Sequence, residues 1–315
     1  MSISSIYNYI VGIHPKIEVF FRKLYWTNIK KTVALRPRSR NQNLRSVDFD
    51  KIIENLRSRG IGSDSIIIVH SSYDILEGSG LTPEEINSKL IELVGTNGTL
   101  VMPVIRRYKE EGKLLDYLTT NLDDTICTYN VKRSQIVSGL LPYMLMQRPD
   151  SSISQFPLNP VVAIGKHAKK MMEKNLEGEN PSPHGPNSSW KYCLDNKAVV
   201  IGLGVEMPHF LTISHVNEEC SETWPIKNWF RKRKFEIIDG NIKIYKEVLE
   251  RKPIWGAIYL AEKNYKKDLL KNGILKIEKV EGLNISIVQS QHLAPFLKKR
   301  TSKAYPYCIK TSLMD

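Results

Sequence analysis

The chain has 315 residues, of which 41% are hydrophobic and 25% are charged, and its formal net charge is +13. This composition is typical of a soluble globular protein with one or two domains, and it excludes the collagen-like and intrinsically disordered classes. The excess of cations favours an anionic partner such as nucleic acid, lipid headgroups or a phosphorylated small molecule.

Residues 1–45 differ in pattern from the rest of the chain. Apolar residues recur near helical spacing between Ile6 and Leu24, and a basic stretch follows from Lys30 to Arg45. We therefore expect a helical extension with a basic linker here, and a second unit over residues 46–315. The extension would pack on its own chain, pack on a partner subunit of a homodimer, or lie on an anionic membrane surface. The sequence leaves these alternatives open.

The cysteines and the apolar runs bear on the cellular setting. Four cysteines lie far apart, and no apolar run reaches the about 18–20 residues that a membrane-spanning helix needs. Such spacing argues against both a disulfide scaffold and a zinc site. We therefore expect a protein of the reducing cytoplasm.

From residue 46 onward, the pattern alternates between helices and strands. Residues 49–56 predict an amphipathic helix with Asp48 as its N-cap, and residues 65–70 predict a buried strand. The next helix is predicted over residues 84–94, because the preceding Thr82-Pro83-Glu84-Glu85 has the order of a capping box. A second apolar strand follows at residues 99–103.

Further strands are predicted downstream at residues 160–165 and 198–204. Residues 235–245 alternate around Asp239-Gly240, which is the strongest hairpin signal in the chain. The sequence thus predicts an α/β fold. It should be a single mixed-sheet domain with helices on both faces and an added antiparallel hairpin, preceded by the N-terminal helical extension.

Two polar segments lie where ligands could bind. His70-Ser71-Ser72-Tyr73 ends a predicted buried strand, and ligands collect at such strand ends in open α/β sheets. The loop from His184 to Ser189 leads into a short predicted helix, and one of its serines could cap that helix beside an anionic oxygen. A plain strand exit and a plain helix cap are the alternative explanations of the two segments.

A third segment, Thr212 to Glu218, carries a candidate base. If it is helical, Thr212, His215 and Glu218 share one face because they are three residues apart. Glu218, or another carboxylate, would then hold one imidazole nitrogen while the other faces a substrate, as a general base requires. An exposed His–Glu pair without function is the alternative. No third ligand at suitable spacing accompanies the pair, so we expect no metal.

Several motifs are absent from the sequence. Gly202 and Gly204 lack the third glycine of a dinucleotide fingerprint, and the chain has neither a Gly-Lys-Ser/Thr phosphate loop nor a Gly-x-Ser-x-Gly elbow. Dehydrogenase, kinase and serine-hydrolase functions are therefore disfavoured.

Taken in order, five blocks resemble the aminoglycoside 3-N-acetyltransferase family over about residues 48–300. The blocks are Val69–Ser72, Gly95–Pro103, Pro157 with Val162–Gly165, His184-Gly185 through Ser189-Trp190, and Val200–Gly204 leading into Thr212–Glu218. No single block is specific for the family, but the order and spacing of the five blocks together are.

The resemblance implies acetyl-coenzyme A as donor, no metal, and direct attack of a substrate amine on the thioester. On that pattern His215 matches the general base, Glu218 is a neighbouring acid, and His184 matches a second family histidine. The residues that match the donor-binding region are Ser71, Ser72, Tyr73, Ser134 and Gln135.

Two departures from the family concern the acceptor, which we expect near Thr212, Phe156 and Glu250. The usual Arg-Ser-x-His-Pro is here Ile153–Pro157, with Phe156 in place of the imidazole, and the acidic segment Glu247–Lys252 contains two cations. Aminoglycosides are polycations that need an acidic pocket. We therefore expect a phosphate-bearing amino sugar, such as a nucleotide-linked precursor of surface polysaccharide, as acceptor.

We therefore expect a small-molecule acceptor as the partner, and no nucleic acid. Two alternatives stay open: an enzyme that acetylates aminoglycoside antibiotics and confers resistance, and a non-catalytic descendant that binds polyanions or membranes.

Overall fold

The computed structural model describes most of the chain after residue 45. The described residues are 46–112, 120–205, 210–222, 224, 227–253 and 259–301, together with the single positions 10, 17 and 20. Except for those three positions, the helical extension expected over residues 1–45 lies outside the described residues. No helix of the described residues is long and apolar enough to cross a membrane.

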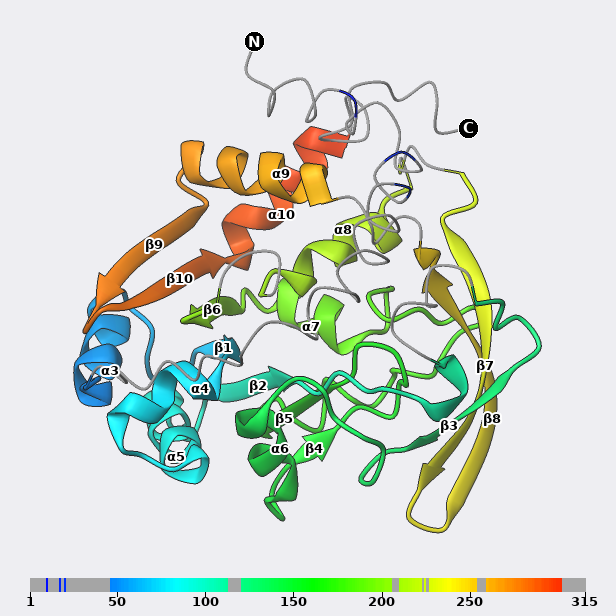
Figure 1. Ribbon diagram of the computed structural model, residues 1–315, viewed down its shortest axis with the longest axis horizontal. Helices are drawn as coiled ribbons and strands as arrows, with labels where there is room; N and C mark the ends of the chain where they lie inside the picture. Colours follow the sequence, from blue (N-terminus) through cyan, green and yellow to red (C-terminus); the bar gives the residue numbers. More distant parts are fainter. Residues whose placement is uncertain are drawn as a thin grey trace, which may run out of the picture.

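A seven-stranded mixed sheet forms the centre of the molecule, in the order β4-β5-β2-β1-β6-β10-β9 (Figure 1). Its three central strands are parallel: β1 (Ile66–Ser71), β2 (Thr99–Pro103) and β6 (Val199–Leu203). Antiparallel strands flank them, namely β5 (Val161–Gly165) and β4 (Ser152–Ile153) on one side and β10 (Leu283–Gln289) and β9 (Leu275–Val280) on the other. The carboxyl ends of the three parallel strands therefore meet at one edge.

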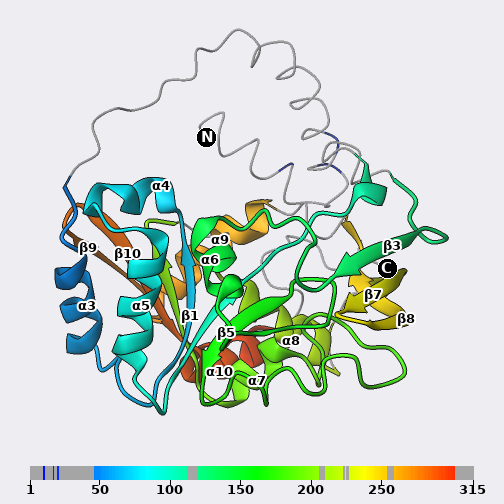
Figure 2. The ribbon, with the colours of Figure 1, turned by 90° about the horizontal axis from the view of Figure 1, so that it is seen from below.

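Helices cover both faces of this sheet (Figures 1 and 2). One face carries α3 (Phe49–Ser58), α5 (Pro83–Val94) and α6 (Leu140–Gln147). The other carries α7 (Ser189–Asp195), α8 (His215–Cys220), α9 (Tyr259–Lys271) and α10 (Ser290–Thr301). Alternate residues of β1 serve the two layers: Ile67 packs with the first set and Ile68 with the second. The predicted α/β class with two covered faces is confirmed.

The predicted helix starts are also confirmed. The Asp48 carboxylate accepts hydrogen bonds from the main chain of α3, at 3.0 Å from the nitrogen of Asp50. Thr82 and Glu85 form the expected capping box of α5. Short α4 (Tyr73–Leu76) follows β1, and 3₁₀ turns lie at Glu77–Ser79, Lys109–Glu111 and Thr212–Ser214.

The predicted hairpin is present but is longer than the sequence suggests. Its strands β7 (Phe230–Asp239) and β8 (Ile242–Arg251) have 10 residues each. They form a separate three-stranded sheet with β3 (Ile126–Asn130), which pairs parallel to β7. This sheet has a hydrophobic core of its own and lies to the right of the large sheet in both ribbon views (Figures 1 and 2).

Candidate active site

A cleft of about 410 Å³ opens beside the loops that leave the large sheet. Its walls come from six segments: residues 105–108 with 111–112 after β2, Val137, the loop Pro157–Asn159 before β5, Pro183 with His184, the helix α8, and the end of β8. The cleft thus brings together His184 and His215, which lie 31 positions apart in the sequence, and adds the last residues of the hairpin.

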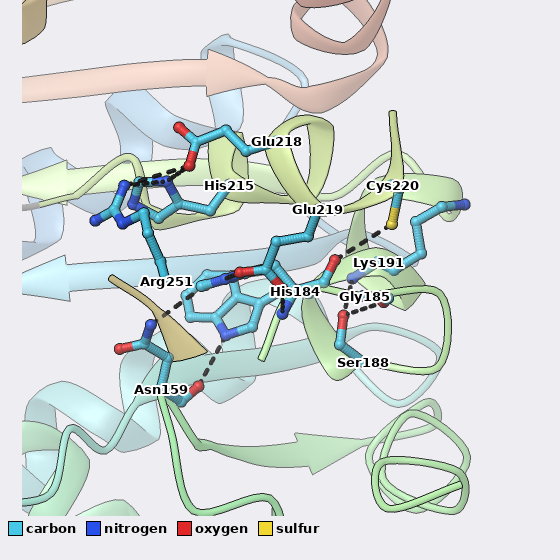
Figure 3. Close-up of polar contacts among 11 residues, drawn as sticks. Asn159, His184, Gly185, Ser188, Lys191, His215, Glu218, Glu219, Cys220 and Arg251 are labelled. Carbon is cyan, nitrogen blue, oxygen red and sulfur yellow. Dashed lines mark hydrogen bonds and ion pairs between the residues drawn. The ribbon is translucent and has the colours of Figure 1, made fainter. Parts of the chain in front are cut away.

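The first histidine of the cleft, His184, is held by Glu219. Its Nδ1 lies 2.8 Å from Glu219 Oε1, and its main-chain N–H donates to the other carboxylate oxygen at 2.7 Å. Both side chains are buried, at 3% and 2% exposed. On the far side of the ring, Nε2 lies 3.4 Å from the side-chain nitrogen of Asn159 (Figure 3). A carboxylate at Nδ1 fixes the tautomer with the proton on that nitrogen, so that Nε2 accepts from the amide.

The second histidine, His215, is held by Glu218 and Arg251. His215 Nδ1 lies 2.9 Å from Glu218 Oε2, which confirms the predicted contact between residues three apart. The Arg251 guanidinium reaches in from β8, at 3.2 Å from the same ring nitrogen and 3.3 Å from the carboxylate (Figure 3). The His215 side chain is 26% exposed, far more than that of His184. No hydrogen bond from a described residue occupies its Nε2.

The charges around His215 set its protonation state. Burial lowers the pKa of His215 below the ordinary value of 6.5, Arg251 and His184 lower it further, and Glu218 opposes them. Burial would raise the pKa of Glu218, but His215 and Arg251 bring it down to about 2. At neutral pH the carboxylate is therefore charged and the imidazole neutral. Its proton lies on Nδ1 facing Glu218, which leaves the lone pair of Nε2 open.

The two histidines are neighbours. Their ring centroids are 5.1 Å apart with an interplanar angle of 60°, and their carboxylate partners are consecutive residues of α8. One short helix therefore orders both imidazoles of the cleft. Chemically, the arrangement suits removal of a proton from a bound nucleophile.

Comparison with known proteins identifies the family. A model of the aminoglycoside 3-N-acetyltransferase family matches residues 68–302. The chain belongs to this family. It is accordingly an N-acetyltransferase by descent. No curated protein sequence matches the chain.

Solved structures of the family share the fold. AAC-IIIb in a binary complex with CoASH is 19% identical, with a TM-score of 0.64 over 80% of this chain and 95% of that one. AAC-VIa bound to sisomicin is 15% identical, with a TM-score of 0.62 over 79% and 94% of the two chains. The YokD protein from Bacillus subtilis is 19% identical, with a TM-score of 0.58 over 79% and 97%.

A second, shallower hollow of about 750 Å³ adjoins the cleft of this family member. Residues 132–137, Gly139 and one side of α6 from Leu140 to Gln147 line it, and Val137 lines both hollows. Ser134 and Gln135, which the sequence predicts to bind the donor, lie in its wall. We call this second hollow the groove.

The other residues named from the sequence lie elsewhere. Ser71 is the last residue of β1, Ser72 precedes α4 and Tyr73 begins it, and none of the three lines either hollow. The Tyr73 hydroxyl donates to the main-chain oxygen of Leu81. Phe156 is buried in the core of the three-stranded sheet, and Thr212 lies in the 3₁₀ turn before α8. Their roles stay predictions. The described residues contain no group of three or more side chains suited to hold a metal.

Two of the groups that order the site, Glu219 and Arg251, were not among the residues predicted from the sequence. Glu219 lies 35 positions after His184, and Arg251 lies 36 positions after His215. The three-residue spacing on α8 singled out Glu218 instead. Neither long-range contact leaves a local signal in the sequence.

Proposed function

We propose that the protein transfers an acetyl group from acetyl-coenzyme A to the amine of a phosphate-bearing amino sugar, with His215 as general base. A nucleotide-linked amino sugar is an acceptor of this kind. The observation that carries the proposal is the open Nε2 of His215 in the cleft, with Nδ1 held by Glu218 at 2.9 Å. The family supplies the reaction class.

The site's own groups account for the proton movements. An amine attacks a thioester only after losing its first proton to solvent. As the C–N bond forms, Nε2 of His215 takes a second proton, and the charged Glu218 stabilises the resulting imidazolium. The imidazolium then protonates the departing thiolate while the C–S bond breaks. Arg251 favours this return, because a neighbouring positive charge lowers the pKa of the imidazole.

The groove suits the donor. Lys132 and Arg133 supply positive charge for phosphates, while Val137, Leu140 and Tyr143 are exposed apolar side chains along the path to the cleft. Because Val137 also lines the cleft, a pantetheine arm in the groove would bring its thioester toward His215. The relative AAC-IIIb was solved with CoASH. On this proposal residues 46–315 form the catalytic unit, and the activity is cytoplasmic.

Aminoglycosides are the second candidate acceptors. Relatives of similar fold were solved with sisomicin and with apramycin. Both candidate classes present a primary amine on a sugar ring, so the same base serves either. They differ in charge, and the charge of the cleft decides between them.

The test is an incubation of the purified protein with acetyl-coenzyme A and four amines. These are a UDP-linked amino sugar, glucosamine 6-phosphate, glucosamine and kanamycin, with thiol release and product mass as readouts. We expect acetylation of the phosphorylated sugars, and loss of turnover in His215→Ala with retained binding of coenzyme A. Transfer to none of the amines, or full activity of the variant, would overturn the proposal; preferred acetylation of kanamycin would assign the antibiotic function.

A further inference from the structure

The acidic side chains that line the cleft already have partners within the protein. Three glutamates line the cleft: Glu111, Glu219 and Glu250. Glu219 holds His184. The other two meet at one arginine of β7, since Arg233 Nη2 lies 3.1 Å from Glu111 and its Nη1 lies 3.0 Å from Glu250.

Arg233 is the centre of this ion-pair network. Its side chain is 0% exposed, and a second arginine of the same strand, Arg231, adds a contact of 2.6 Å to Glu250. Opposite charges in contact cancel most of each other's field at a distance. The arginines therefore largely neutralise the negative charges of Glu111 and Glu250. These two carboxylates attract a polycation in the cleft only weakly.

Two consecutive arginines of the cleft, Arg106 and Arg107, have no carboxylate in ion-pair contact among the described residues. Arg106 is 7% exposed and its guanidinium donates to main-chain oxygens of Val131, at 2.7 Å, and of Ser134, at 2.5 Å. Its buried Nε has no hydrogen-bond partner. The Arg107 side chain is exposed, and its one hydrogen bond to a described residue runs from the guanidinium to the main-chain oxygen of Gly112, at 3.5 Å. Among the described residues, neither arginine forms an ion pair with a carboxylate.

We propose that Arg107, backed by the buried charge of Arg106, binds the anionic group of the acceptor, while Arg233 and Arg231 disfavour polycationic acceptors by neutralising Glu111 and Glu250. The group bound would be a phosphate or carboxylate on the amino sugar. A buried, uncompensated guanidinium attracts an anion strongly because little water screens it, and an exposed neighbour can make the direct contact. This inference deepens the proposed function and rests on it.

Arg107→Gln tests the anion subsite. Loss of a charge-assisted hydrogen bond should raise the KM for glucosamine 6-phosphate roughly tenfold or more. The KM for unphosphorylated glucosamine and the KM for acetyl-coenzyme A should stay within about twofold, a change of only ~0.4 kcal/mol. Lys109→Gln is the matched control, since it removes an exposed positive charge nearby that does not line the cleft.

The pattern of KM values separates the two sources of phosphate. A rise in the KM for acetyl-coenzyme A alone would place a donor phosphate at Arg107 and overturn the inference, as would no change in any KM. Calorimetric titration of the UDP-linked amino sugar into wild type and Arg107→Gln, without donor, measures the subsite independently of turnover. Failure of acetyl transfer with intact, Arg107-dependent binding would therefore count against the proposed function and not against the subsite.

Arg231→Gln tests the neutralisation of the acidic wall. Freed from one cation, Glu250 should attract a polycation, so the ratio of kcat/KM for kanamycin to that for glucosamine 6-phosphate should rise severalfold. Arg233→Met should raise it further, and a thermal melt reports whether this buried change leaves the fold intact. Lys232→Gln is the control, because Lys232 pairs with Glu247 on the exposed side of the hairpin. An unchanged ratio in a folded Arg231→Gln protein would overturn this part.

Discussion

The two histidine–glutamate pairs of the cleft use neighbouring residues of one helix and yet differ in environment. His184 and Glu219 are almost fully buried, and Glu219 binds both the ring and the main chain of residue 184. His215 and Glu218 are partly exposed and share a guanidinium from the second sheet. On the proposed function the two pairs have different roles: the closed pair fixes the shape of the cleft, and the open pair exchanges a proton with the substrate.

The largest expected effect comes from removing the open imidazole. His215→Gln should lower kcat by about 10²–10⁴-fold, the usual contribution of a general base, with little change in the KM for acetyl-coenzyme A. His184→Gln keeps a hydrogen-bonding side chain at the closed position and should cost a smaller factor. Steady-state kinetics of both variants measures the difference. A greater loss in His184→Gln would reverse the assignment of the two roles.

Stability should show the opposite ranking. Glu219→Leu leaves two buried donors of His184 without an acceptor, at about 1–3 kcal/mol each, so the free energy of unfolding should fall by about 2–6 kcal/mol. Glu218→Leu should cost less, because the donors of His215 and Arg251 reach water in the cleft. Urea unfolding of the two variants compares them directly. Equal losses would show that the two pairs are equally structural.

The pH dependence of kcat/KM can resolve which charges act on His215. The acidic limb should lie below 6.5, because the pKa of His215 is lowered. Glu218 raises that pKa, so Glu218→Gln should move the limb to lower pH; Arg251 lowers it, so Arg251→Met should move the limb to higher pH. Shifts of both variants in the same direction would contradict the electrostatic account.

The smallest expected effect concerns the scaffold beneath the closed pair. The Ser188 hydroxyl oxygen accepts the main-chain N–H of Lys191 and so caps α7, whose Trp190 ring lies beside His184. Ser188→Ala should destabilise the protein by about 1 kcal/mol, as the loss of an N-cap does. A thermal melt measures this effect, while Asn187→Ala just outside the cap serves as control. A variant as stable as wild type would show that the cap is dispensable.

The sequence predicted the parts of the fold that have local signals. Asp48 and the Thr82–Glu85 capping box predict the starts of their helices, because a helix cap is formed by residues close together in the sequence. The hairpin of β9 and β10 went unrecognised. Its turn places Glu281 and Gly282 at φ values of 50° and 80°, and glutamate is a rare residue in that left-handed region, where asparagine or aspartate is the usual signal.

The full length of the β7–β8 hairpin was also not predicted from the sequence, because one of its strands carries a residue of the site. Arg233 occupies an inward position of β7 and is fully buried against two carboxylates, so the alternation of apolar and polar residues breaks there. The candidate site divides in the same way. Its local pair, His215 with Glu218, could be predicted from spacing, whereas Glu219 with His184 and Arg251 with His215 depend on how distant segments meet.

The most direct test of the account is the protonation state of one ring, read by nitrogen NMR of histidine-labelled protein. The His215 signals are assigned by their absence from His215→Gln. The account predicts a neutral imidazole at neutral pH with its proton on Nδ1, titrating below 6.5. A proton found on Nε2, or a titration above 6.5, would leave the cleft without a base at that position and would contradict it.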